Sequence, residues 1–361
     1  MIIGILTFHR AYNYGAVLQC YALQKYLQRL GYEVSIIDYR QPWTESLRET
    51  FSIGKIRQLF RHPFALWNYF ISWRKRKKCL KQSHLVFDTF LNKYLNISNT
   101  CYNSKDFPID YDCYFIGSDQ LWSVSCLGGK LDEIYLANFP HKQDAKVIGY
   151  AISTSNKSFD KLEAIGIKNI IQNFSYLSFR EESVSLYINT KYKRNFQTCV
   201  DPTILCDRHI WDKLINEEWS KKNYILIYEA RDAVDYPNLI NNKAKELSIK
   251  VGNGCNVVNL SNMQYHVDDF ISAFVYAQCV ITTSFHATVF SVIFNKPFYS
   301  IKLNDGADSR YENLLIMLGL SKQCVSPDFI PSIPFIDYEP VLEKLNLLRK
   351  TSEEFLKTSL L

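Results

Sequence analysis

His286 is the residue whose surroundings most clearly suggest chemistry. It follows the β-branched run Ile281–Thr283 and begins a stretch of small residues that ends near Ser291. The run is typical of a buried strand, and the stretch after it is typical of the first turns of a helix. Ligands of parallel α/β sheets bind beyond the carboxyl ends of the strands, where the next helix presents unpaired N–H groups to an anion. The alternative is a histidine with only a structural role at a helix start.

Cations follow this turn within one further strand and loop. They are Lys296, Lys302 and Arg310, which could hold a phosphate or a carboxylate. No charged residue lies between Asp269 and Lys296, so a membrane span is a competing interpretation. The centre of that stretch is too polar for it, because its hydroxyl, amide and imidazole groups would lie in lipid without partners.

Two motifs in the first half also follow strand-like runs. Asn13, Tyr14 and Gly15 open a helix-like segment, which suits an anion or a sugar hydroxyl but lacks the glycine pattern of dinucleotide binding. The run Gly117–Trp122 places a carboxylate, an amide and an indole together, in Asp119, Gln120 and Trp122. That set is common in sugar sites, and the alternative is an aspartate cap with the tryptophan in the core.

Two shorter charged motifs have simple structural explanations. Arg180 and Glu181 stand at the end of a strand-like run, and Asp201 precedes Pro202. An ion pair and an Asp-Pro turn account for them.

Composition indicates a globular protein. The chain has 361 residues, of which 47% are hydrophobic, enough for two domains with their own cores. Its 10 cysteines include no C-x-x-C pair, so we expect a reduced cytoplasmic chain without a disulfide framework or metal site. Residues 1–8 lack the basic start and the length of a signal peptide and are predicted to form a strand.

Positive charge is concentrated in one segment. The net charge is +6, but residues 51–87 hold nine Lys and Arg and no Asp or Glu, so the remainder carries 6 − 9 = −3. We predict a basic helical insertion at about 51–95, whose aromatic residues and cations could contact an anionic membrane at its inner face. A solvated helix face is the alternative. Nucleic acid is not expected, because no recognised binding module is present.

The remaining pattern alternates between strands and helices. Residues 2–8, 15–30 and 32–39 predict a βαβ unit, and further strands are expected at 111–116, 146–152 and 175–179. A second series begins near 223, with a helix at 237–247 and short strands at 250–254, 279–283 and 297–301. We therefore predict two parallel-sheet domains, 1–207 and 208–361.

Together these motifs resemble the polysaccharide pyruvyl transferase family. The resemblance runs from about residue 1 to 320 and rests on five motifs in order: 13–19, 117–122, 178–181, 201–203 and 283–291, followed by Arg310 before Leu314–Leu315. It implies a GT-B-like fold of two Rossmann-like domains facing across a cleft. It also implies phosphoenolpyruvate as co-substrate and a hexose of a surface polysaccharide, or of its lipid-linked precursor, as acceptor. The product would be a pyruvate ketal.

The resemblance also suggests roles for residues. His286 would be the catalytic acid and Arg310 the main donor clamp. Asp119 is a candidate proton acceptor. The other expected contacts are, for the donor, Lys302, Ser284 and Thr288, and, for the acceptor, Asn13, Tyr14, Gly15, Gln120 and Trp122. No metal and no cofactor are expected. A nucleotide-sugar glycosyltransferase of the same fold, or a scaffold of a polysaccharide assembly complex, are the alternatives.

Overall fold

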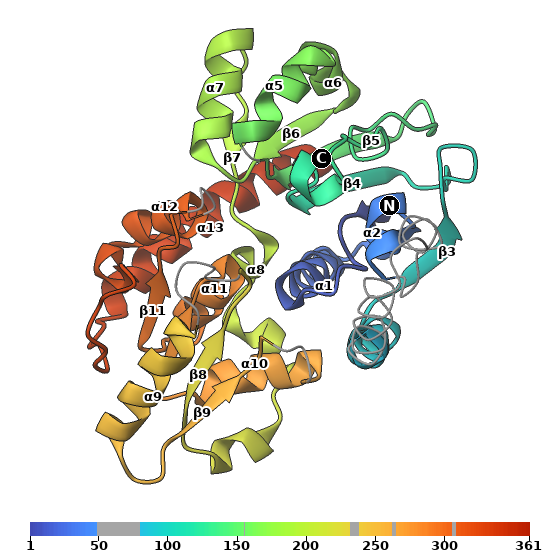
Figure 1. The fold of residues 1–361 in the computed structure, drawn as a ribbon. Coiled ribbons are helices and arrows are strands. Elements are labelled where there is room, and N and C mark those ends of the chain that lie inside the picture. The colour runs from blue at the N-terminus through green and yellow to red at the C-terminus, as the bar shows by residue number, and fades with distance from the viewer. Residues whose placement is uncertain (49–79, 155, 232–237, 262–264, 305–307) are drawn as a thin grey trace, which may run out of the picture.

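The computed structural model describes residues 1–48, 80–154, 156–231, 238–261, 265–304 and 308–361. These residues form two parallel β-sheets with helices packed around them (Figure 1). Both sheets confirm the predicted α/β class. Among the described helices, none combines the length and the apolar composition that a membrane span requires.

The first sheet has seven strands in the order β3-β2-β1-β4-β5-β6-β7. Its order reverses between β1 and β4, and such a switch point opens a ligand crevice at the carboxyl ends of the strands. The strands are β1 (Ile2–Leu6), β2 (Glu33–Tyr39), β3 (Ile97–Cys101), β4 (Cys113–Asp119), β5 (Lys146–Ile152), β6 (Tyr176–Phe179) and β7 (Gln197–Thr198). The helices of this half are α1 (Tyr14–Arg29), α2 (Pro42–Arg48), η1 (Val124–Leu127), α5 (Asn156–Ala164), α6 (Ile167–Ile170), η2 (Ile171–Asn173) and α7 (Glu182–Tyr192).

The second sheet has five strands in the order β12-β11-β10-β8-β9, with its switch point between β8 and β10. Its strands are β8 (Tyr224–Tyr228), β9 (Asn256–Asn259), β10 (Cys279–Thr282), β11 (Phe298–Ile301) and β12 (Cys324–Val325). The helices are α9 (Leu239–Val251), α10 (Val267–Tyr276), α11 (Phe285–Ile293), α12 (Ser309–Leu318) and η5 (Ser321–Gln323), with α8 (Pro202–Leu205), η3 (Arg208–Leu214) and η4 (Glu217–Lys221) between the sheets in sequence.

One predicted strand in this half was misplaced. We expected a strand at 250–254, but α9 continues to Val251 and ends at Gly252, and β9 begins at Asn256. Gly252 and Gly254 both have positive φ, so this stretch turns the chain instead of extending it. The strand is formed by the next β-branched pair, Val257–Val258.

The two sheets share a hydrophobic core. The ring of Tyr14 in α1 stacks on Phe270 of α10 at 4.4 Å between centroids, and its hydroxyl donates to the carbonyl of Tyr265 at 2.7 Å. Both residues belong to one continuous cluster of buried apolar side chains that extends into both halves of the chain. Burial of this cluster joins the two domains on the side occupied by α1, α10 and α11.

The last helix, α13 (Glu339–Leu360), returns from the second sheet to the first (Figure 1). The N–H of Val200 donates to Ser352 at 2.9 Å, and the Arg349 guanidinium donates to the carbonyl of Ile204 at 2.7 Å. Our sequence-based division placed residues 208–361 in the second domain. Helix α13 therefore belongs to the second domain by its position in the sequence but also contacts the first domain.

The predicted basic insertion is described only in part. Residues 51–79 lie outside the described ranges, so the helical insertion at 51–95 is not confirmed and the membrane contact of 51–87 stays a prediction. Residues 80–94 are helical. Their apolar side chains Phe87 and Phe90 are buried in the core shared by the two sheets, which fixes this helix against α1.

Candidate functional site

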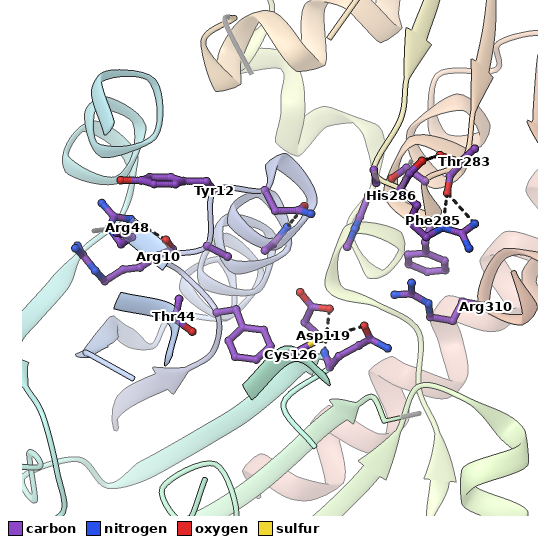
Figure 2. A pocket seen from close by; sticks show the side chains of 18 residues that line it. Arg10, Tyr12, Thr44, Arg48, Asp119, Cys126, Thr283, Phe285, His286 and Arg310 are labelled. Atoms are coloured by element: carbon purple, nitrogen blue, oxygen red, sulfur yellow. Dashed lines mark hydrogen bonds between the residues drawn. The ribbon is translucent and has the colours of Figure 1, made fainter. Parts of the chain in front are cut away.

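A cavity of about 530 Å³ lies between the carboxyl ends of the two sheets (Figure 2). The first domain supplies the loop after β1, part of α2 and the end of β4. The second domain supplies the segments after β8 and β10 and one residue of α12. The two Rossmann-like domains therefore face each other across this cavity, as the sequence predicted.

His286 lines the cavity as the second residue of α11. Ser284 caps this helix, since its hydroxyl accepts the N–H of Ala287 at 3.4 Å, and Ser284 also lines the cavity. Because the first N–H groups of a helix have no partner inside it, this turn offers the donors that an anion site requires, and anion binding here stays a prediction.

Gly15 of α1 packs directly on the imidazole. A Cβ at this position would lie 2.0 Å from Nδ1 of His286 and 2.3 Å from its Cγ, so only glycine allows the two helices to approach this closely. Gly15 is not among the residues that line the cavity. Its predicted contact with an acceptor sugar is replaced by contact with the histidine.

Asp201 lies behind the imidazole and is fully buried. Its Oδ2 is 3.6 Å from Nε2 of His286, an ion-pair distance that is too long for a direct hydrogen bond, and 2.8 Å from Arg180. The N–H and hydroxyl of Thr203 donate to Oδ1. Burial alone would raise the pKa of Asp201, but His286, Arg180 and Thr203 outweigh it and hold this pKa well below its usual range. The carboxylate is therefore ionised beside the imidazole.

Arg180 connects Asp201 to the cavity. Its guanidinium is 3.4 Å from Glu181, 3.9 Å from Asp119 and over the ring of Phe285 at 4.9 Å. Burial would lower the pKa of Arg180, but the surrounding carboxylates raise it. The ion pair predicted at 180–181 is therefore real, and it belongs to a larger network that the sequence motif did not reveal.

Arg310 reaches the cavity from α12 (Figure 2). Its Nε is buried and has no hydrogen-bond partner among the described residues. Burial, with a contribution from Arg180, lowers the pKa of Arg310, although a guanidinium stays charged near neutral pH. The neighbouring Arg231 differs, because it donates to Asp308 at 2.7 Å and to the carbonyl of Thr283. Arg310 is therefore the better placed of the two to bind an incoming anion.

Asp119, Gln120 and Asn13 line the first-domain side of the cavity, as predicted. Asp119 has a φ of +76°, a region that non-glycine residues rarely adopt and that occurs preferentially at functional sites. Asn13 caps α1 by accepting the N–H of Ala16 at 3.2 Å.

Four further predicted residues lie outside the cavity lining. Trp122 is buried in the core and donates to the carbonyl of Tyr135, so it cannot offer its face to a sugar. Tyr14 is buried between the domains. Thr288 is buried within α11 and donates to the carbonyl of Ser284. Lys302 is paired with Glu312, which occupies its charge away from the cavity.

Several cavity residues were missed by sequence reasoning. Arg10, Arg48, Arg231 and Cys126 all line the cavity. Arg10 lies in the predicted loop after the first strand, which was its available signal. Arg231 follows the strand that ends at Tyr228, which was also a signal, whereas Arg48 and Cys126 lie outside any strand-end motif. Among the described residues, no group of three or more His, Cys, Asp or Glu could hold a metal ion.

Comparison with protein families identifies one match. The model of the polysaccharide pyruvyl transferase family matches residues 13–305. Among curated proteins, none matches the sequence significantly.

Similar solved structures include two UDP-GlcNAc 2-epimerases. The enzyme from Neisseria meningitidis, bound to UDP-GlcNAc, is 10% identical, with 99% of this chain and 93% of that chain covered and a TM-score of 0.48. The enzyme from Methanocaldococcus jannaschii is 12% identical, with 99% of both chains covered and a TM-score of 0.48. An alpha-glucosyltransferase in complex with UDP and DNA is 12% identical, with 99% and 95% covered and a TM-score of 0.45.

Proposed function

This chain belongs to the polysaccharide pyruvyl transferase family, and from that premise we propose which reaction its cavity performs. The donor is phosphoenolpyruvate. The acceptor is a hexose of a surface polysaccharide or of its lipid-linked precursor, and the product is a cyclic pyruvate ketal. The observation that carries the proposal is the Arg310 side chain, whose buried Nε has no partner in the described residues and which lines the same cavity as His286 and the start of α11.

The second-domain wall suits a small donor with two anionic groups. Phosphoenolpyruvate carries a phosphate and a carboxylate on a three-carbon skeleton, so its site needs fixed cations and N–H donors close together. Arg310 can bind one anionic group with two parallel hydrogen bonds, and the N-terminal turn of α11 can receive the other. Arg231 supports this wall through its bonds to Thr283 and Asp308.

His286 is positioned to supply the proton. It lines the cavity, its Nε2 is buried toward Asp201, and its Nδ1 lies against Gly15 of α1. The proton moves to the methylene carbon of the donor, and the neighbouring carbon becomes an electrophile that a sugar hydroxyl attacks. Asp201 stabilises the protonated imidazole before transfer.

Asp119 is the candidate base on the opposite wall. It takes the proton of the first attacking hydroxyl while the new C–O bond forms. Asp119 passes this proton to the departing phosphate, whose loss regenerates the electrophile. A second hydroxyl of the same hexose then closes the ketal and its proton returns to His286, so that one donor and one diol give one ketal and one phosphate. Asn13 and Gln120 would hold sugar hydroxyls.

Two measurements test this function. Calorimetry with phosphoenolpyruvate and with a UDP-sugar separates the pyruvyl transferase from a nucleotide-sugar glycosyltransferase, and we expect binding of phosphoenolpyruvate only. Mass spectrometry of the native glycan, with and without the intact gene, should show loss of a pyruvyl group. A glycan that is unchanged by deletion and by His286→Ala would favour a non-catalytic scaffold.

A further inference from the structure

A second cavity, of about 570 Å³, lies at the carboxyl-terminal edge of the first sheet. We call it the edge groove. Its lining includes Tyr39, Tyr102, Asp132, Glu133 and Asn138. Its described lining contains carboxylates, amides, hydroxyls and aromatic rings, but neither lysine nor arginine. The edge groove therefore differs in charge from the site cavity, which contains four arginines.

The aromatic side of the edge groove is held in place by its loop. Tyr102 directly follows β3, and its side chain is 61% exposed. Asp106 accepts the N–H groups of Tyr102 and Asn103 at 2.9 and 2.8 Å, which closes a tight turn. An exposed ring on a fixed turn offers a flat apolar face to a ligand with little loss of chain entropy.

The polar side is also ordered. The hydroxyl of Tyr39 donates to Asp132 at 2.9 Å, and the amide of Asn138 donates to Glu133 at 3.0 Å. These bonds orient the carboxylates and leave oxygen atoms with further capacity to accept hydrogen bonds. Clustered acceptors next to an aromatic face match a polyhydroxylated ligand.

The edge groove lies close to the site cavity. A small cavity between them is lined by Arg10, which also lines the site, and by Tyr39, which also lines the edge groove. Trp43 of α2 lies in the same region. Its ring lies against Gly128, where a Cβ would be 2.7 Å away, and its neighbour Thr44 lines the site. Trp43 is 42% exposed, so a second aromatic side chain is accessible on α2, next in sequence to a residue that lines the site.

We propose that Trp43 and the edge groove bind uncharged sugar residues next to the hexose that is modified. The acceptor is then an oligosaccharide or a longer glycan, and its flanking residues carry neither phosphate nor carboxylate. Aromatic faces stack on the C–H faces of sugars, and the carboxylate and amide oxygens accept hydrogen bonds from sugar hydroxyls. Anionic sugars would meet the uncompensated carboxylates of the edge groove and be repelled. This proposal rests on the proposed function for the acceptor, but its binding site can be tested separately.

The test is glycan binding without donor, measured by saturation-transfer NMR. The probes are neutral hexasaccharides of glucose, mannose and galactose, with oligogalacturonate of the same length and the free monosaccharides for comparison. We expect a neutral hexasaccharide to bind more tightly than its monosaccharide and oligogalacturonate to fail. Tyr102→Ala and Trp43→Ala should each weaken hexasaccharide binding by about three- to tenfold, the effect of one aromatic contact.

Matched variants show whether the effect belongs to this groove. Tyr102→Phe keeps the ring and should retain binding. Tyr187→Ala removes a tyrosine that is 39% exposed on α7 and should have no effect. Absence of binding to every neutral probe, binding unchanged in both alanine variants, or preference for oligogalacturonate would overturn the proposal.

A transfer assay separates this result from the main function. If pyruvyl transfer is observed while Tyr102→Ala leaves glycan binding unchanged, only the proposal that the edge groove binds glycan is refuted. If the neutral probes bind through Tyr102 but phosphoenolpyruvate is not used, the edge groove stands as a glycan site and the proposed reaction fails.

Discussion

The two walls of the site cavity differ in how their arginines are balanced. On the first-domain wall, Arg10 pairs with Glu45 at 2.7 Å and Arg48 pairs with Asp88 at 2.7 Å. On the second-domain wall, Arg310 has a buried Nε without a partner among the described residues and stands near the start of α11. A cation that is already paired adds little attraction for an anion, so the number of arginines on a wall does not identify the anion site. On this basis we propose that the donor binds the second-domain wall and the uncharged acceptor binds the first.

The largest expected effect concerns His286, which belongs to the second-domain wall and touches the first. His286→Gln should reduce turnover by about 10²- to 10⁴-fold, the usual contribution of a positioned general acid. Donor affinity should change little, because Arg310 and the helix start remain. Single-turnover rates and calorimetry measure the two quantities. His209→Gln, at a histidine that is 85% exposed, is the control, and an unchanged rate in His286→Gln would leave the residue with a structural role only.

Asp119→Asn tests the opposite wall. If Asp119 accepts the hydroxyl proton, kcat/KM for the acceptor should fall by about 10²-fold. Donor affinity should stay the same or increase, because the change removes a negative charge that acts on Arg310. Steady-state kinetics with each substrate varied in turn will separate these effects. Weaker donor binding with normal acceptor kinetics would mean that the two walls are assigned the wrong way round.

Asp201→Asn tests the support behind His286. The pKa of Asp201 is lower in the folded protein than in the unfolded chain, so the carboxylate stabilises the fold above about pH 4 and this contribution is lost as pH falls further. Removal of one member of a buried ion pair costs about 3–5 kcal/mol at neutral pH. The variant should also lose less stability than the wild type between about pH 5 and about pH 2.

Urea unfolding at several pH values measures this difference. Asp207→Asn is the matched control, since Asp207 pairs with Arg29 and these side chains are 43% and 60% exposed, whereas Asp201 is fully buried. It should change the free energy of unfolding by about 1 kcal/mol or less. Equal losses in the two variants would show that Asp201 has no special role in the buried network.

Arg310→Lys sharpens the comparison of paired and unpaired cations. Lysine keeps the charge but loses the planar pair of donors, so the dissociation constant of the donor should rise by about ten- to a hundredfold, the effect of losing a charged hydrogen bond. Lys302→Gln should leave donor affinity unchanged, because Lys302 is already paired with Glu312 outside the cavity. Calorimetry measures both. An equal loss in the two variants would indicate a diffuse positive field in place of a specific clamp.

The sequence predicted the sheets better than it predicted the site. Buried β-branched runs gave most strands correctly, because burial on both faces requires such runs in a parallel sheet. Strand β3, Ile97–Cys101, was missed because its alternation is weak and three of its five residues are polar. The turn at His286 was found because a strand, a cap and a helix start leave a local signature.

Site residues that depend on distant partners could not be predicted in this way. Asp201 precedes a proline, and a turn explained it until the structure brought Arg180 and His286 beside it. Trp122 follows a strand end, where a tryptophan can equally belong to the core or to a sugar site. Lys302 was expected at the donor because its sequence position gives no sign of the pairing with Glu312. Local patterns locate the edge of a sheet, whereas the balance of charge there is set by tertiary contacts.

Gly15→Ala carries the smallest expected effect and tests the contact between the walls. The added methyl group would lie 2.0 Å from Nδ1 of His286, so either α1 or the imidazole must move. We expect a loss of about 1–3 kcal/mol in unfolding free energy, typical of overpacking, together with reduced turnover. The same change in a His286→Ala background should cost much less, because the clash is gone, and thermal unfolding of the four proteins gives this coupling energy. Additive losses in unfolding free energy would mean that the Gly15→Ala effect arises within α1. The contact between Gly15 and His286 would then not couple the stabilities of the two walls.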